Sequence, residues 1–182
     1  GLAGYKAKPH IMIAAWYWPS YFSPEQHERG LRLVTSEWRR AAPDSAPITA
    51  KASALYAVGT LAKQKADSLG YDDALMLDHL GQVAEASAAN IFFTKGDELI
   101  APISASYLNG ITRQTVIVLA RRRGIPVTER SVRPEELGGF DGCFLTGTAA
   151  EVAPVGEIDG QHYQITPMIR QLVDDYSAEV RR

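Results

Sequence analysis

The sequence predicts an α+β domain with mixed or antiparallel sheets and flanking helices. Some stretches repeat apolar residues at helical spacing, and short runs rich in Val, Ile, Thr and aromatic residues lie between them. Glycine and proline mark the turns that separate these stretches. A chain of 182 residues, 46% of them hydrophobic and 22% charged, can bury a sizeable core. Since we find no internal repeat or low-complexity tract, we expect one layered domain.

The early part of the chain contains two expected strands, a helix and irregular connectors. The runs with the length and composition of strands are His10 to Trp18 and Leu31 to Trp38. Proline, serine and glycine between these runs predict a loop, and Ala41 to Pro47 predicts a second loop. From Lys51 to Gly70 the apolar residues keep near-helical spacing and proline is absent, which predicts a helix that Gly70 ends.

The period then changes to that of a sheet. Short runs separated by turn signals predict an antiparallel meander over Asp73 to Asp78, Gln82 to Ala86, Asn90 to Thr94 and Glu98 to Ala101. We expect a helix from Thr112 to Arg123 and a closing helix from Thr166 to Arg181, with Pro167 in its first turn. Strands are expected between these helices, at Val127 to Val132, Gly142 to Thr146 and Glu151 to Ile158.

Charge and cysteine content exclude several classes of function. A formal net charge of −2 provides no basic field for nucleic acid or anionic lipid. The run Arg121 to Arg123 suits the C-terminal end of a helix better than a phosphate polymer. The single cysteine, Cys143, excludes an internal disulfide and a cysteine-rich metal site, and its apolar neighbours favour a buried role. No apolar stretch has the length of a membrane span, so we expect a soluble, cytoplasmic protein without metal, nucleic-acid or membrane partners.

Two loops combine small residues with hydroxyl groups. Gly110-Ile111-Thr112-Arg113 opens a helix, where unpaired N–H groups and the helix dipole suit a phosphate. Thr146-Gly147-Thr148-Ala149-Ala150 follows an apolar strand and leaves its backbone accessible. Taken singly, Thr112 is more often a helix N-cap and the second loop a plain turn. Together the loops could grip one phosphate monoester from two sides, although neither matches a nucleotide-binding loop.

Two charged residues stand in apolar surroundings. Lys51 lies between the small or apolar stretches Ala46 to Ala50 and Ala52 to Ala54, where desolvation favours the neutral amine that can attack a carbonyl. Tyr56 follows five positions later, so on a regular helix the two side chains would diverge by about 140°. Lys51 should therefore precede the helix if both side chains reach one ligand. Glu85 either pairs with a basic neighbour, protects a strand edge, or faces a protonated heterocyclic nitrogen.

These groups match pyridoxal 5′-phosphate (PLP): an amine for its aldehyde, a carboxylate for its pyridine nitrogen, a tyrosine for its phenolic oxygen and two loops for its phosphate. Along nearly the whole chain, the motifs also resemble the successive signatures of class IV aminotransferases, the fold-type IV PLP enzymes. Those motifs are Arg40-Ala41-Ala42-Pro43, Lys51-Ala52-Ser53-Ala54-Leu55-Tyr56, Glu85-Ala86-Ser87-Ala88-Ala89-Asn90-Ile91-Phe92, Gly110-Ile111-Thr112-Arg113 and Thr146-Gly147-Thr148-Ala149-Ala150-Glu151. Within the family, the first and last of them look like branched-chain aminotransferases.

The resemblance implies roles for individual residues. Lys51 would be the Schiff-base lysine and the base that moves the α-proton, Tyr56 would hydrogen-bond the phenolic oxygen, and Glu85 would pair with the pyridine nitrogen. Further cofactor contacts, to the phosphate and the face of the ring, would come from Leu108, Gly110, Ile111, Thr112, Gly147 and Thr148. The backbone of Thr148 and Ala149 would meet the substrate carboxylate.

The resemblance also implies a domain organisation and an activity. Residues 1–45 would be the tail of a small N-terminal domain and a link, and residues 46–182 the PLP-binding large domain. We expect a homodimer that transfers the amino group of branched-chain L-amino acids to 2-oxoglutarate. The alternatives are a D-amino-acid transaminase, an aminodeoxychorismate lyase, or a PLP-binding fragment without turnover. At Ala54-Leu55 and Ala88 this sequence differs from the residues that are common in the family motifs. We expect these differences to affect substrate preference more than cofactor chemistry.

Overall fold

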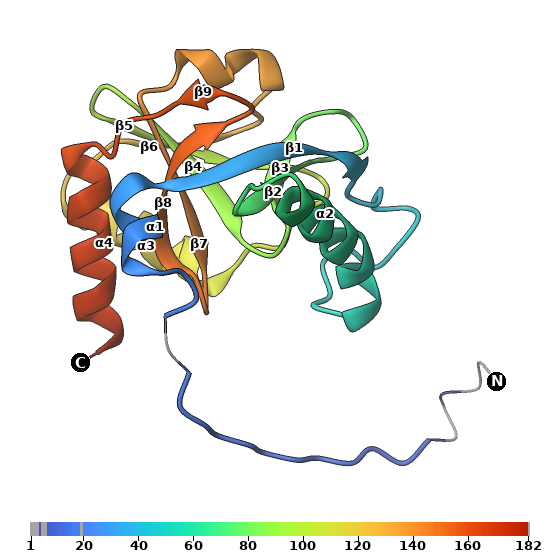
Figure 1. The fold of residues 1–182 in the computed structure, drawn as a ribbon. Helices are drawn as coiled ribbons and strands as arrows, with labels where there is room; N and C mark the ends of the chain where they lie inside the picture. Colours follow the sequence, from blue (N-terminus) through green and yellow to red (C-terminus); the bar gives the residue numbers. More distant parts are fainter. Residues whose placement is uncertain (1–3, 5–6, 19, 182) are drawn as a thin grey trace.

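In the part of the chain that the structure describes, nine strands join in one mixed sheet that curls on itself, with helices packed against its outer side (Figure 1). The computed structural model describes residues 4, 7–18 and 20–181. The strands are β1 (Leu31–Arg39), β2 (Asp73–Leu77), β3 (Val83–Ala86), β4 (Asn90–Lys95), β5 (Glu98–Pro102), β6 (Val127–Arg130), β7 (Gly142–Gly147), β8 (Glu151–Ile158) and β9 (Gln161–His162). The helices are α1 (Pro24–Arg29), α2 (Tyr56–Ser68), α3 (Ile111–Arg122) and α4 (Pro167–Val180), with 3-10 turns η2 (Ser53–Leu55) and η3 (Pro134–Gly139).

The strand order corrects the predicted antiparallel meander. The sheet runs β3-β2-β1-β8-β7-β4-β5-β6, and β9 pairs with β8. The hairpins β2-β3 and β4-β5 form as expected, but β3 does not pair with β4. Instead β4 pairs with β7, which places Phe92 opposite Phe144. Such a pairing joins distant parts of the chain, and a local turn pattern cannot specify it.

Alternation along the strands divides the core between the two faces of the sheet. On β4, Ile91 and Phe93 belong to the cluster inside the curl. Phe92 points the other way and stacks on Phe144 within the cluster beneath α3 and α4. On the neighbouring part of the sheet, α2 covers β1 and β2, and Ala66 of the helix shares a buried cluster with Met76. This is the period-two pattern of strands that are buried on both faces.

The N-terminal segment departs from the prediction. Residues 10–18 were expected to form a strand, but they have no strand pairing, and Ile11, Met12 and Ile13 are about nine-tenths exposed. Figure 1 shows this segment leading away from the sheet. An apolar sequence becomes a strand only when a neighbouring backbone is present to pair with it. Pro19, which helped to predict the following loop, lies outside the described residues.

The expected loop before β1 contains a short helix that sequence reasoning missed. Ser23 caps α1 by accepting a hydrogen bond from the Gln26 N–H, and the Gln26 side chain accepts one from the Ser23 N–H. Gly30 follows the helix with a φ of 77°, in the left-handed region. The signal was present, because serine followed three residues later by glutamine is a capping box.

The other elements are confirmed within a few residues. The helix predicted from Lys51 begins only at Tyr56, so Lys51 precedes α2, as is required if Lys51 and Tyr56 reach one ligand. In α4, Thr166 is the N-cap and Pro167 is the first helical residue. The arginine run ends α3 and forms ion pairs within the domain, including Arg123 with Asp175. The Cys143 thiol is buried in the core, which raises its pKa.

Candidate active site

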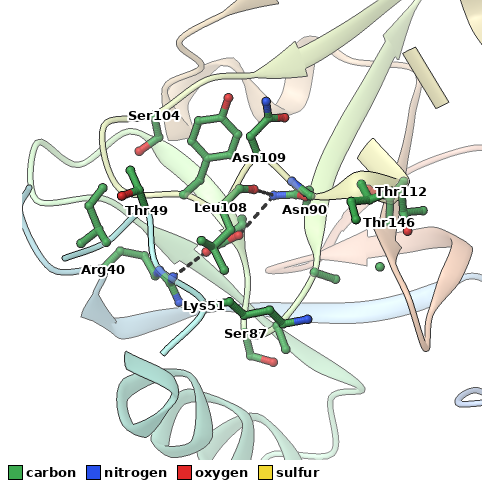
Figure 2. A pocket seen from close by; sticks show the side chains of 18 of the residues that line it. Arg40, Thr49, Lys51, Ser87, Asn90, Ser104, Leu108, Asn109, Thr112 and Thr146 are labelled. Carbon is green, nitrogen blue, oxygen red and sulfur yellow. Dashed lines mark hydrogen bonds and ion pairs between the residues drawn. The ribbon is translucent and has the colours of Figure 1, made fainter. Parts of the chain in front are cut away.

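A cavity of about 510 Å³ lies where the start of α2, the end of β3, the start of α3 and the end of β7 meet. This volume is typical of small-molecule sites. All the residues predicted to form the site line it except Ala149. Figure 2 shows Arg40 and Thr49 at the opposite end of the cavity from Thr112 and Thr146. The fold therefore collects side chains that are far apart in the sequence around one space.

Lys51 lies in the irregular segment just before η2 and lines the cavity together with Tyr56. In Figure 2 Lys51 lies in the lower part of the view and Asn109 in the upper part. The Lys51 side chain is exposed, so the desolvated environment expected from its apolar sequence neighbours is not formed by this chain. Tyr56 is half-buried at the first turn of α2. The two side chains face one cavity because the helix begins only after Lys51.

Glu85 is buried in the cavity wall and forms an ion pair with Arg40. The Nη2 atom of Arg40 lies 2.8 Å from Oε1 of Glu85, and the two side chains are 10% and 6% exposed. Burial raises the pKa of the Glu85 carboxyl to about 7, while the Arg40 charge and a backbone hydrogen bond from Leu108 oppose the rise. Glu85 thus pairs with a basic residue, which is one of the alternatives left open by the sequence, and it also lines the cavity.

The N-terminus of α3 forms one end of the cavity. Gly110 is its N-cap, with φ −62° and ψ 146°, and it lines the cavity with Ile111 and Thr112. The interpretation of Thr112 as an N-cap is wrong, because Thr112 is the second residue of the helix, and its hydroxyl lies 3.2 Å from the Tyr176 hydroxyl of α4. The first N–H groups of a helix have no acceptor within the helix. This end of the cavity therefore offers backbone donors and the positive end of a helix dipole to an anion.

The last residues of β7 and the loop after it contribute to the same end. Thr146 is buried, and its Oγ1 has no hydrogen-bond partner among the described residues. Gly147 and Thr148 follow it along the cavity wall, and Thr148 is exposed. A buried hydroxyl without a partner costs free energy, so a ligand that satisfied Thr146 would be stabilised there.

Sequence reasoning missed two residues that organise the cavity wall. Arg40 belongs to one of the recognised motifs, but no role was assigned to it. A signal for its role was present, because a glutamate such as Glu85 in an apolar run needs a cationic partner when it is buried. Asn90 also stood in a motif, and its side chain donates a hydrogen bond to Oε2 of Glu85 at 3.2 Å. Within the described ranges, His, Cys, Asp and Glu side chains do not gather in a group that could hold a metal ion.

Comparison with known proteins assigns the family. Residues 2–158 match the family model of amino-transferase class IV. The chain belongs to this family. As a class IV aminotransferase chain it is 43% identical over 159 residues to a probable branched-chain-amino-acid aminotransferase of Rickettsia felis. That match covers 87% of this chain and 55% of the Rickettsia felis protein.

Solved structures agree with the class IV assignment. The branched-chain amino acid aminotransferase of Escherichia coli superposes with a TM-score of 0.87 and 34% identity, covering 91% of this chain and 56% of that one. An aminotransferase from Brucella abortus, bound to the cofactor PLP, superposes with a TM-score of 0.79 and 31% identity. This second match covers 84% of this chain and 55% of the other. The predicted fold-type IV architecture is therefore confirmed.

The class IV chain spans about half the length of the relatives that it matches. The similarity therefore concerns about half of each relative, and the part of this chain that is similar contains the cavity. Among the described helices, none combines the length and hydrophobicity needed to cross a bilayer.

Proposed function

We propose that this chain is the PLP-binding part of an aminotransferase that moves the amino group of branched-chain L-amino acids to 2-oxoglutarate, with Lys51 bonded to the cofactor. The observation that carries the proposal is the single cavity that receives an amine, a buried carboxylate and a helix N-terminus. The names of the relatives support the branched-chain substrates.

The cavity residues fit PLP group by group. The phosphate requires several donors, and the free N–H groups at the start of α3, with the Thr148 hydroxyl, supply them. The Oγ1 atom of Thr146, which has no hydrogen-bond partner in the described part of the chain, lies at the same end and adds a hydroxyl. The pyridine nitrogen requires a carboxylate that is shielded from water, which the buried Glu85 supplies. Tyr56 is available to the phenolic oxygen, and Leu108 to the face of the ring.

When bound, PLP supplies an electron sink for the charge that develops at the substrate Cα. Lys51 would hold the cofactor aldehyde covalently and would carry the proton that moves at Cα. Glu85 would keep the ring nitrogen protonated, because a buried carboxylate is stabilised by a facing cation. Thr148 lines the cavity and would offer its backbone N–H to the substrate carboxylate, with Ala149 next along the chain.

We further propose that the protein is a cytoplasmic homodimer. Lys51 and Thr148 line the cavity yet are exposed, so a further protein surface is needed to exclude water from the reaction. A second subunit would supply such a surface. The single buried cysteine suits a reducing compartment.

The decisive experiment is covalent trapping. The purified protein is mixed with PLP, reduced with borohydride and digested, and peptide mapping should find the label on Lys51. Lys51→Ala should lose the label and the visible absorption band, whereas Lys63→Ala should keep both, because Lys63 lies on α2 and pairs with Asp67 outside the cavity. A label on another lysine, or no label, would overturn the assignment. Turnover of L-leucine against D-alanine and aminodeoxychorismate then separates the three activities.

A further inference from the structure

The Asn90 side chain joins the two ends of the cavity wall. Asn90 is the first residue of β4, is 6% exposed, and pairs in register with Thr146 of β7. Its Nδ2 atom lies 3.2 Å from Oε2 of Glu85 and 2.7 Å from the Leu108 carbonyl oxygen. Its Oδ1 atom accepts a hydrogen bond from the Gly110 N–H at 3.3 Å. One amide therefore contacts the carboxylate, the backbone beside it and the N-cap of α3.

These three contacts are mutually consistent. An asparagine amide has two N–H donors and one acceptor oxygen. The two donors meet acceptors, the Glu85 carboxylate and the Leu108 carbonyl, and the oxygen meets a donor. Rotating the amide by 180° would place its oxygen against those two acceptors. The contacts therefore define a single orientation of the Asn90 side chain.

Gly110 permits the close approach. A Cβ atom at this position would lie 2.5 Å from Oδ1 of Asn90, which is closer than real Cβ contacts allow. The φ and ψ values of Gly110 are ones that any residue can adopt, so conformational freedom does not account for the glycine. The glycine is explained instead by the space that the Asn90 side-chain amide needs next to residue 110.

We propose that Asn90 is a positioning residue that sets the separation between the Glu85 carboxylate and the N-terminus of α3, so that one ligand satisfies both. The inference rests on the proposed function, in which the ligand is PLP. Asn90 acts through its neighbours: it orients the group that meets the ring nitrogen and holds the backbone that meets the phosphate.

The test measures the affinity for PLP and for pyridoxal, which lacks the phosphate, in the wild-type protein and in Asn90→Ala. The ratio of the two dissociation constants reports how much the phosphate contributes. In the variant this ratio should fall about tenfold or more, because the phosphate can no longer bind in register with the ring. Thr94→Val is the matched control. Thr94 is buried on the same strand, lies outside the cavity, and its hydroxyl has no partner among the described residues.

The ratio distinguishes positioning from a contribution to folding alone. A purely structural asparagine would lower the melting temperature and leave the ratio unchanged, and an Asn90→Ala ratio within twofold of wild type would overturn the proposal. If Asn90→Ala does not fold, Asn90→Asp decides. Aspartate keeps an acceptor for Gly110 but cannot donate to Glu85 or Leu108, so the carboxylate and the start of α3 should lose their spacing and the ratio should again fall. A ratio within twofold of wild type in Asn90→Asp would refute the positioning role.

The result is also separable from the proposed function. If the wild-type protein binds no PLP, the proposed aminotransferase function itself is wrong. A wild-type protein that binds PLP, with an unchanged ratio in Asn90→Ala, removes only the role of Asn90. A double-variant cycle adds a further check: Gly110→Ala should weaken PLP binding less in the Asn90→Ala background, where the Oδ1 atom is gone, than in wild type. Equal losses in the two backgrounds would contradict the proposed contact.

Discussion

Arg40 and Glu85 form a buried ion pair, with Nη2 and Oε1 2.8 Å apart. Arg40 directly follows β1 and Glu85 lies on β3, so the pair connects two strands that do not neighbour each other in the sheet. The Nε atom of Arg40 also donates to the Ser106 carbonyl at 3.3 Å, which ties the pair to the loop before α3. A buried pair of this kind is costly to break, because the remaining charge has no counterion.

Replacing Arg40 should raise the pKa of Glu85 further. In Arg40→Gln the charge that opposes the effect of burial is lost, so the pKa of Glu85 should rise by about one unit or more above its present value. A carbon-13 NMR titration of the cofactor-free protein measures this directly. Arg39→Gln is the matched control, since Arg39 is adjacent and exposed and lines no part of the cavity. An equal pKa in the two variants would show that the ion pair does not affect Glu85.

Glu85 should make the stability of the cofactor-free protein depend on pH. Its pKa rises from the ordinary 4.5 to about 7 on folding, so between these values the folded state keeps a proton that the unfolded state releases. Stability from this group is therefore highest below pH 4.5 and falls as the pH rises to about 7, by on the order of 3 kcal/mol. Glu85→Gln lacks this dependence. Urea denaturation at pH 4.5 and 7.5 should show the variant gaining stability relative to wild type at the higher pH, and a constant difference would contradict the raised pKa.

Gly59 should not tolerate alanine, although it lies inside α2. A Cβ atom on Gly59 would overlap the backbone carbonyl oxygen of Ser87, a residue of the cavity wall. Alanine improves helix propensity by about 1 kcal/mol. The clash should outweigh this gain and destabilise the protein by about 1–3 kcal/mol, because backbone atoms cannot move aside cheaply. Thermal unfolding measures the effect against Thr60→Ala, an exposed neighbour on the same helix. A Gly59→Ala protein as stable as wild type would place Ser87 elsewhere.

Two threonines at the phosphate end should behave differently. Thr112→Val removes the hydrogen bond to Tyr176 and should lower stability by about 1 kcal/mol, yet it keeps the backbone N–H and should bind PLP nearly as well as wild type. Thr148→Val removes a hydroxyl at the cavity and should weaken PLP binding about tenfold with little change in stability. Calorimetry and ligand titration of both variants measure the two effects. If Thr112→Val lost affinity as strongly as Thr148→Val, the backbone role of α3 would be wrong.

Local patterns identified most elements but not their partners. The helical spacing after Lys51 and the turn signals around β2 to β5 were sufficient because they depend on neighbouring residues alone. The strand expected over residues 10–18 failed for the opposite reason: its apolar residues remain exposed where no described backbone pairs with them. The meander failed because β4 found its partner in β7, much later in the chain.

The sequence by itself determined which chemical groups this protein carries and roughly where most of its helices and strands lie. An amine before a helix, a carboxylate in an apolar run and two small hydroxyl loops are properties of residue order, and they predicted the family. Only the tertiary structure decided what each group contacts. Glu85 meets Arg40, and Thr112 meets Tyr176, because the fold brings distant segments within hydrogen-bond distance. Burial and pKa follow from those contacts, since both depend on neighbours in space rather than in sequence.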